Sequence, residues 1–234
     1  MSVLHVEKVN QYYGESHTLW DVELDVPEGT CTCLMGRNGV GKTTLLKSIM
    51  GSLPVQSGQI SLGGKPLRGL AAWDRARLGI GLVPQGREIF ALLTVEENLL
   101  VGLAGARGRR KRSIPARIFE LFPVLKEMLA RRGGDLSGGQ QQQLAIGRAL
   151  MAEPKLLILD EPTEGIQPNI VQQIGDILIR LNTEEKLTIL LVEQKLPFAR
   201  RVGRHFAVLD RGRNVASGTM DQLTDEIVQR HLVV

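Results

Sequence analysis

A glycine-rich segment near the N-terminus contains the residues needed to hold a phosphate group. It runs Gly36-Arg37-Asn38-Gly39-Val40-Gly41-Lys42-Thr43 and fits the phosphate-binding loop pattern, with a lysine and a hydroxyl residue after its last glycine. The glycines allow a tight turn in which backbone N–H groups point at phosphate oxygens. The Lys42 ammonium can then reach the β- and γ-phosphates, and the Thr43 hydroxyl can bind Mg²⁺. A glycine-rich turn with no ligand is the alternative interpretation.

The sequence on either side of this segment predicts the elements that such a loop requires. Residues 31–35 form an apolar run typical of a buried strand, and residues 44–50 predict the start of a helix. A helix in that place directs its positive N-terminal end at the same anion. Cys31 and Cys33 lie two residues apart on the predicted strand, so both thiols point to one face. We therefore expect buried, reduced thiols and no metal cluster at these cysteines.

Two adjacent carboxylates follow a second apolar run, at residues 156–159. Such a continuous run is typical of a parallel strand that is buried on both faces, and ligands bind at the carboxyl ends of parallel strands. Asp160 can hold Mg²⁺ through its water shell, and Glu161 can orient and polarise a water molecule for attack on the γ-phosphate. Without the phosphate-binding loop, an ordinary boundary between a strand and a turn would be the better interpretation.

A third segment, Asp135 to Gln140, predicts another anion site. Ser137 is a good N-cap for a helix predicted over 140–152, and Gly138 and Gly139 leave its first backbone N–H groups bare. A bare helix N-terminus attracts an anion, yet the chain's own loop already surrounds its nucleotide. The simplest partner is therefore a phosphate held by an opposite chain.

Taken together, these motifs resemble those of the nucleotide-binding subunits of ATP-binding-cassette (ABC) transporters, over essentially the whole chain. The resemblance implies ATP and Mg²⁺ as cofactors, with Tyr13 stacked on adenine and Tyr12 as a neighbour that shares or replaces it. It implies that Gln85 contacts Mg²⁺ and the attacking water. The implied residues for the chain's own nucleotide are Tyr13, Gly36, Arg37, Asn38, Gly39, Val40, Gly41, Lys42, Thr43, Thr44, Gln85 and Asp160, and those for the partner's nucleotide are Ser137, Gly138, Gly139 and Gln140. The implied metal ligands are Thr43, Gln85 and Asp160. The implied catalytic residues are Glu161, Gln85 and Gln194.

Two positions depart from the pattern of that family. Gln194 stands where most such ATPases carry a histidine that senses the γ-phosphate, and Gln167 stands where an aspartate usually lies in a loop that reaches across the dimer. Glutamine can donate a hydrogen bond but cannot carry a positive charge, so it stabilises transition-state charge less well. We therefore favour a heterodimer with a second ATPase subunit that retains the histidine, the alternative being a symmetric homodimer.

The expected fold is α/β, with a P-loop NTPase core around a mixed, largely parallel sheet, an N-terminal antiparallel β subdomain and an inserted α-helical subdomain. We expect one domain over 1–234, with its core in 1–85 and 153–234 and the helical subdomain in 86–152. Within that subdomain, helices are predicted over 95–103 and 114–122. Strands are predicted at residues 4–9, 20–26, 59–62, 80–83, 156–159, 188–192 and 205–209.

Composition limits the class of protein further. The chain has 234 residues, a net charge of +4 and a sequence pI near 9.3. Much of the excess charge lies in the basic run 107–112, interpreted as a solvated hairpin tip, with an anionic membrane surface as the alternative partner. Aromatic residues are only 4% and do not alternate with this run, which argues against nucleic acid. We expect a location on the cytoplasmic face of the cell membrane, because no apolar run approaches the roughly 20 residues that span a bilayer and no secretory signal is evident.

The leading functional hypothesis is the energy-coupling ATPase of an importer. The resemblance implies two transmembrane permease subunits, an indirect link to a periplasmic or extracellular substrate-binding protein, and a permease contact near residues 87–93. Phe90, Leu92 and Leu93 in that segment could equally belong to the core. Among subfamilies the chain most resembles the urea-type ATP-binding subunits of the branched-chain amino-acid and urea uptake group. The alternatives are an exporter ATPase and a soluble cassette ATPase that acts on nucleic acid or ribosomes.

Overall fold

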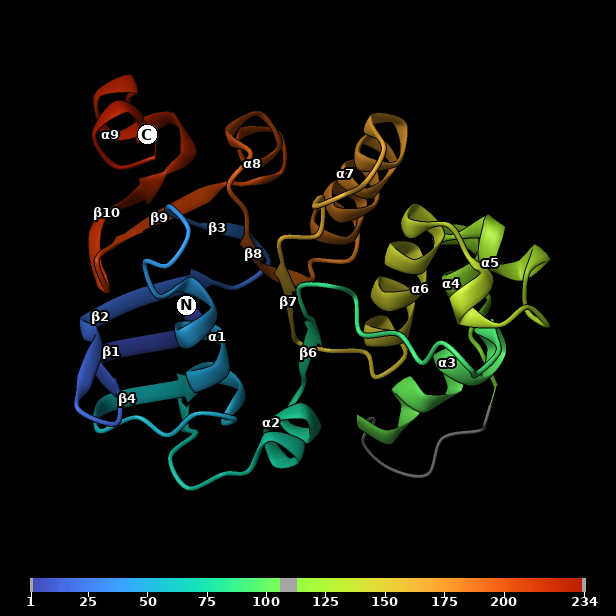
Figure 1. Cartoon of the computed structure of the whole chain (residues 1–234), viewed down its shortest axis with the longest axis horizontal. Coiled ribbons are helices and arrows are strands. Elements are labelled where there is room, and N and C mark those ends of the chain that lie inside the picture. Colours follow the sequence, from blue (N-terminus) through green and yellow to red (C-terminus); the bar gives the residue numbers. More distant parts are fainter. Residues whose placement is uncertain (1, 106–112, 233–234) are drawn as a thin grey trace.

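Residues 2–105 and 113–232 of this computed structural model form two β-sheets flanked by helices (Figure 1). The first sheet is antiparallel, with the order β2-β1-β4-β5. The second has the order β10-β9-β3-β8-β7-β6, and only its edge strand β10 is antiparallel to its neighbour. The strands are β1 Ser2–Tyr13, β2 Ser16–Pro27, β3 Cys31–Met35, β4 Ser57–Leu62, β5 Lys65–Pro66, β6 Ile80–Val83, β7 Leu156–Asp160, β8 Thr188–Val192, β9 His205–Asp210 and β10 Arg213–Thr219.

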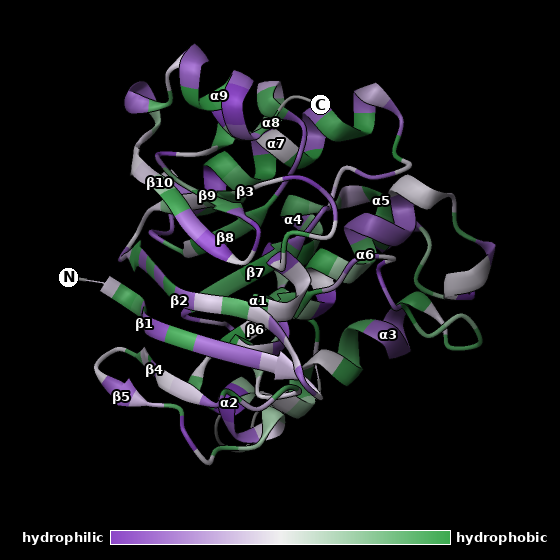
Figure 2. Ribbon diagram, turned by 60° about the vertical axis from the view of Figure 1, so that its left-hand side comes forward, coloured by the Kyte–Doolittle hydropathy of each residue, from purple (hydrophilic) through white to green (hydrophobic). Residues whose placement is uncertain are grey.

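The second sheet is buried on both faces. Along β7, Leu157 and Leu159 pack into one core with the helices α6 (Gly138–Leu150), α7 (Pro168–Thr183) and α8 (Leu196–Val202). Leu156 and Ile158 pack into another core with α1 (Lys42–Met50) and the antiparallel sheet. This arrangement explains why the strand has no polar alternation. Figure 2 shows β7 as largely hydrophobic, while β1 alternates between hydrophilic and hydrophobic positions.

Helices α3 to α6 lie together on the side of the molecule away from β1, β2 and β4 (Figures 1 and 2). The helices are α1 Lys42–Met50, α2 Ala72–Leu78, α3 Val95–Val101, α4 Ala116–Leu121, α5 Pro123–Glu127, α6 Gly138–Leu150, α7 Pro168–Thr183, α8 Leu196–Val202 and α9 Asp225–His231, with the 3₁₀ turns η1 Gly102–Gly105, η2 Gly133–Asp135 and η3 Met220–Gln222. Within the described ranges, no helix is long and apolar enough to cross a bilayer.

The predicted α/β fold and all eight predicted strands are confirmed, most of them inside longer strands. The sequence does not predict β10, because this edge strand is built from small and polar residues that alternate between exposed and half-buried. Cys31 and Cys33 are buried and unpaired, as expected. The basic run 107–112 lies outside the described residues.

Several predicted helix boundaries were wrong. The helix predicted over 114–122 begins at Ala116, because a proline at 115 disfavours helical geometry in the residue before it. The helix predicted over 95–103 ends as α3 at Val101 and continues as the 3₁₀ turn η1. The helix predicted over 140–152 runs from Gly138 to Leu150, and α1 begins at Lys42, two residues before the predicted start.

Candidate functional site

The carboxyl ends of three buried strands lie side by side. Val192 at the end of β8 pairs with Leu34 of β3 on one side and with Asp160 of β7 on the other. The chain that leaves each of these strands therefore enters the same part of the molecule. The loop 36–41, the carboxylates after β7 and the loop after β8 are thereby brought together, although the first lies more than a hundred residues before the other two in the sequence.

The loop 36–41 depends on glycine at two points of close approach. Gly36 has φ 151°, and a Cβ atom there would overlap the carbonyl oxygen of Leu209. Gly41 is the N-cap of α1 with φ 109°, and a Cβ atom there would lie 2.9 Å from Cδ2 of Leu19. Neither position has room for a side chain, so these glycines fix how the loop packs on β9 and β2.

Lys42 is held inside the loop. Its side chain is only 5% exposed, and its Nζ atom donates hydrogen bonds to the carbonyl oxygens of Gly36, at 2.7 Å, and Arg37, at 2.9 Å. Burial lowers the pKa of Lys42, while the nearby carboxylates of Glu161 and Asp160 raise it. The ammonium group is thus kept at the point that the loop encloses, where it can pair with an anion.

Asp160 is a buried carboxyl group at the end of β7. Burial raises its pKa to about 6, with a further contribution from the adjacent Glu161 and an opposing one from Lys42. Such a group favours a cation beside it. It lines a cavity of about 350 Å³ together with Thr43 and Gln85, and these oxygen donors suit a hard ion such as Mg²⁺.

Glu161 has a left-handed backbone conformation, with φ 48°. Its carboxylate lies 3.7 Å from the Lys42 ammonium and accepts a hydrogen bond from Nε2 of Gln194. The same Gln194 nitrogen donates to Oδ1 of Asn38 at 2.6 Å. Gln194 therefore joins the carboxylate after β7 to the phosphate-binding loop. A strained backbone at a carboxylate of this kind is typical of functional sites.

Gln85 also lies in this part of the molecule, but its amide contacts a different carboxylate. It lines a cavity of about 250 Å³ with Lys42, Thr43 and Glu161, while its Nε2 atom donates to Oε2 of Glu164 at 2.9 Å. The remaining residues of that cavity come from the loop and the start of α1: Asn38, Gly39, Gly41 and Thr44. The structure thus brings together most of the residues predicted for the phosphates and the metal ion.

Glu193 is a residue of this site that the sequence analysis missed. It is 2% exposed, and its carboxylate accepts hydrogen bonds from the backbone N–H groups of Gln194 and Lys195, each at 2.9 Å, and from the Thr163 hydroxyl at 2.7 Å. Lys195 in turn donates to the Thr163 carbonyl oxygen. Glu193 fixes the loop that carries Gln194. A carboxylate directly after an apolar strand is the same signal that identified Asp160.

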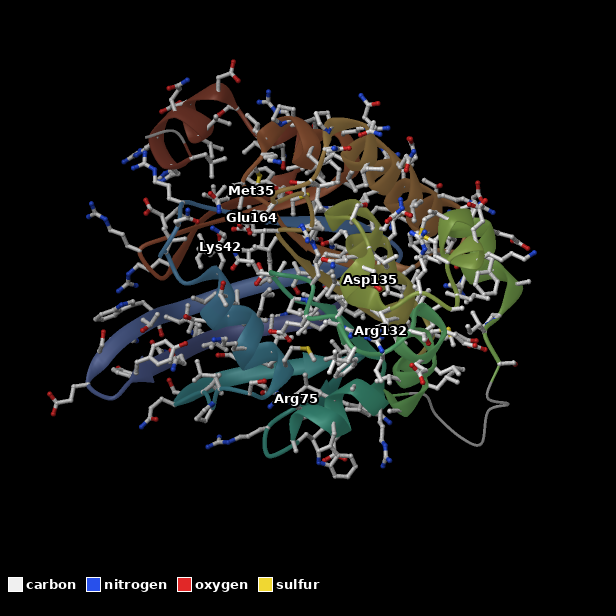
Figure 3. All side chains as sticks on the ribbon, turned by 45° about the vertical axis from the view of Figure 1, so that its right-hand side comes forward. Met35, Lys42, Arg75, Arg132, Asp135 and Glu164 are labelled. Carbon is white, nitrogen blue, oxygen red and sulfur yellow. The ribbon has the colours of Figure 1, made fainter. Side chains whose placement is uncertain are left out.

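The segment predicted to bind a second phosphate lies elsewhere. Ser137 caps α6 as predicted: its hydroxyl accepts from the Gln140 backbone N–H, and the Gln140 side chain accepts from the Ser137 N–H. Residues 137–140 line a cleft of about 740 Å³ that also contains Gly165 and Gln167. Figure 3 shows Asp135, at the start of this segment, well separated from Lys42, whereas Met35 and Glu164 lie near Lys42.

The two tyrosines lie outside the two cavities described around Lys42. Tyr13 is 48% exposed at the end of β1, and Tyr12 stacks on His17 with ring centroids 4.0 Å apart. In the segment 87–93, Phe90 is exposed and Leu92 is 83% exposed, so these two side chains do not belong to the core.

Comparisons with known proteins agree with one another. Residues 19–164 match a family model described as ABC transporter. The high-affinity branched-chain amino acid transport ATP-binding protein BraG of Pseudomonas aeruginosa is 44% identical over 93% of each chain. The probable branched-chain amino acid transport ATP-binding protein LivF of Archaeoglobus fulgidus is 39% identical over 95% of this chain and 94% of its own. Among solved structures, the ADP conformation of MJ1267, an ATP-binding cassette of an ABC transporter, has a TM-score of 0.86 at 28% identity and covers 98% of both chains.

Proposed function

This chain belongs to the ABC transporter family, and we propose that it is the ATP-hydrolysing, energy-coupling subunit of an importer for urea, branched-chain amino acids or related short amides. ATP is its substrate and the family's activity is ATP hydrolysis coupled to transport. Subunits of this family work with membrane permeases, so the chain associates with the membrane peripherally. We place that association on its cytoplasmic face.

The observation that carries this proposal is the cluster of Lys42, Glu161 and Gln194 at the carboxyl ends of three parallel strands. Backbone N–H groups of the loop and the Lys42 ammonium hold the phosphates. Glu161 orients a water molecule in line with the γ-phosphate and accepts its proton, while Gln194 fixes the direction of that carboxylate. Negative charge that develops on the γ-phosphate is stabilised by Lys42.

A magnesium ion fits the residues of this site. Asp160 is a buried carboxyl group with a pKa raised to about 6, and it shares a cavity with the oxygen atoms of Thr43 and Gln85. These three residues would hold the ion, which when bound neutralises charge on the β- and γ-phosphates. The hydrogen bond from Gln85 to Glu164 uses the amide nitrogen of Gln85, so its amide oxygen is left for the metal ion.

We propose that each chain also contributes to the nucleotide site of a partner subunit. The exposed N-terminus of α6, with Ser137 to Gln140, would contact the γ-phosphate of a nucleotide held by a partner subunit. We assign residues 86–152 to an inserted helical subdomain that carries this contact, and residues 1–85 and 153–234 to the nucleotide-binding core. Because this chain has Gln194 and Gln167 at the two departing positions, we favour a heterodimer with an ATPase that retains the histidine.

Two permeases and a substrate-binding protein complete the proposed assembly. The exposed Phe90 and Leu92 lie in the segment 87–93, which suits a contact with a permease helix. The names of BraG and LivF indicate branched-chain amino acids, whereas segments such as Asn10 to Gly14 and Cys31 to Gly39 resemble the urea-type subunits. The transported molecule does not bind this subunit, so the choice rests on similarity.

Uptake measurements test this proposal. Cells that carry either the parent chain or Glu161→Gln are supplied with labelled urea and, separately, labelled leucine, with Glu164→Gln as a control for a nearby carboxylate. We expect Glu161→Gln to abolish uptake of one of these compounds while the complex still assembles with its permeases in membrane extracts. Unchanged uptake of both compounds, together with recovery of the chain in soluble nucleoprotein alone, would contradict an importer.

A further inference from the structure

Four side chains form a continuous stack beside the end of the β1–β2 hairpin. Tyr12 stacks on His17 with centroids 4.0 Å apart and an interplanar angle of 13°, and His17 stacks on Trp20 at 3.5 Å and 28°. The guanidinium carbon of Arg213 lies 5.0 Å from the centroid of the Trp20 ring. The stack therefore joins three strands, β1, β2 and β10, through aromatic and cation–π contacts.

Hydrogen bonds fix the stack at its edges. Nε2 of His17 lies 2.9 Å from Oδ1 of Asn10, and that same oxygen accepts from the backbone N–H of Asp21 at 3.1 Å. The indole N–H of Trp20 donates to the carbonyl oxygen of His17 at 3.2 Å. Both inner rings are thus held in position by polar contacts as well as by stacking, although the stack lies at the surface.

The same stack is tied to the phosphate-binding loop. The backbone N–H of Trp20 donates to the carbonyl oxygen of Gly212 at 2.8 Å, and the Gly212 N–H donates to the carbonyl oxygen of Val40 at 2.9 Å. Leu19, next to Trp20, lies against Gly41 closely enough to exclude a side chain there. Two backbone hydrogen bonds and one packed contact therefore connect the stack to the loop.

Tyr13 is left available by this arrangement. Tyr12 pairs with His17 and Tyr13 pairs with Ser16, so the two tyrosine side chains point to opposite faces of the hairpin. The ring of Tyr12 is committed to the stack, whereas that of Tyr13 is 48% exposed. Tyr13 lies opposite Ser16, three residues or about 10 Å along β2 from the contact of Leu19 with the loop.

We propose that Tyr12, His17, Trp20 and Arg213 are positioning residues, which hold the hairpin so that Tyr13 meets the adenine of ATP bound by the loop. This inference rests on the proposed function, because it takes ATP as the ligand, and it takes Tyr13 as the base contact that the family resemblance implies. We expect the four residues to act on the base alone, because none of them lines the two cavities around Lys42. Loss of the stack would therefore weaken ATP binding without changing the chemical step.

Binding measurements with two ligands distinguish an effect on the base contact from an effect on the phosphate contacts. The affinities of the full-length chain for ATP and for inorganic tripolyphosphate, which has no base, are measured for Trp20→Leu. We expect the ATP affinity to fall on the order of fivefold, since stacking of one base contributes about that much or more, and the tripolyphosphate affinity to stay unchanged. In the assembled complex KM for ATP should rise while kcat stays the same.

Three further variants serve as controls. Trp73→Leu removes the chain's other tryptophan, which is exposed on α2 beneath Arg77, and should change neither affinity. Trp20→Phe keeps a stacked ring and should restore most of the ATP affinity. Arg213→Gln removes only the outer end of the stack and disturbs the fold least, so it should give a smaller effect in the same direction.

The decisive comparison is a double-mutant cycle with Tyr13→Ala. If the stack acts through Tyr13, Trp20→Leu has no further effect once Tyr13 is removed. Additive effects, equal losses for both ligands, or no loss for Trp20→Leu and Arg213→Gln would each overturn the positioning role. One other result would instead contradict the proposed function. If the parent chain bound ATP no more tightly than tripolyphosphate and Tyr13→Ala had no effect, the chain would have no base site.

Discussion

The phosphate-binding loop and the N-terminus of α6 are both predicted anion sites, but only the first is complete within this chain. Around the loop, Lys42 and Asp160 are buried, and hydrogen bonds join Asn38, Gln194 and Glu161. At α6, residues 137–140 are exposed or half-exposed along an open cleft, and the side chains of Ser137 and Gln140 each accept a hydrogen bond from the other's backbone N–H group.

Because of this difference, we expect the first region to determine nucleotide binding and the second to affect ATP turnover. The loop has a buried ammonium, a carboxylate and a metal-suited cavity, so a single chain has what it needs to hold a nucleotide. The α6 terminus supplies N–H groups, with the Arg87 guanidinium beside Gly138 and Gln141, and it lies far from the chain's own Lys42 (Figure 3). We propose a phosphate on another chain as its partner, so damage there should lower the turnover of the assembled complex and leave ATP binding by the isolated chain unchanged.

Loss of the carboxylate in the first region should have the largest effect. In Glu161→Gln, we expect ATP turnover by the assembled complex to fall about 10²- to 10⁴-fold, the range that general base catalysis contributes. Glutamine keeps the shape and can still accept the hydrogen bond from Gln194, so ATP affinity should be retained. Turnover and affinity are measured on the same preparation. A variant that hydrolyses ATP at the parent rate would require a different base.

Removal of the buried ammonium should weaken binding itself. Lys42→Ala deletes a charge-assisted contact to the phosphates, and such contacts contribute about 1.5–3 kcal/mol, or roughly a 10- to 100-fold change in the dissociation constant. The affinity of the isolated chain for ATP is measured by titration, with the exposed Lys65→Ala as a control for charge. If Lys42→Ala bound ATP as tightly as the parent does, the buried ammonium would not contribute to a nucleotide site within this chain.

Damage to the second region should leave ATP binding by the isolated chain unchanged. Ser137→Ala removes the N-cap of α6 and should lower the free energy of unfolding by about 1 kcal/mol. Its ATP affinity as a single chain should not change, whereas turnover of the assembled complex should fall. Urea unfolding, ATP titration and the ATPase assay of the complex give the three values. A loss of ATP affinity in the isolated chain would show that α6 contributes to its own nucleotide site.

The strands and the phosphate-binding loop could be predicted because local signals decide them. Apolar runs such as 156–159 and 188–192 have no polar alternation, and Gly41-Lys42-Thr43 has a fixed spacing before a helix. Ser137 as an N-cap was equally local and is confirmed. In these cases the residues that make the signal are close together in the sequence.

Contacts between distant residues could not be predicted in the same way. The bridge from Gln194 to Asn38 and Glu161 joins three separate segments, and the role of Glu193 depends on Thr163, thirty residues earlier. The edge strand β10 is set by pairing with β9, because its own small residues have little strand preference. Helix boundaries near 95–103 and 114–122 depended on proline geometry and on packing.

The smallest expected effect concerns the position where this chain departs from its family. In Gln194→His, an imidazolium near the γ-phosphate would add one charge at an exposed site, a contribution of about 0.5–1 kcal/mol or roughly a two- to fivefold rise in turnover. Part of that gain is offset, because the Gln194 amide donates to both Asn38 and Glu161, and one imidazole nitrogen cannot serve both. Asn38→Ala separates the two contributions, since it removes the first hydrogen bond alone. ATP turnover by the assembled complex is the measurement, and an unchanged rate in Gln194→His would mean that glutamine does not limit this site.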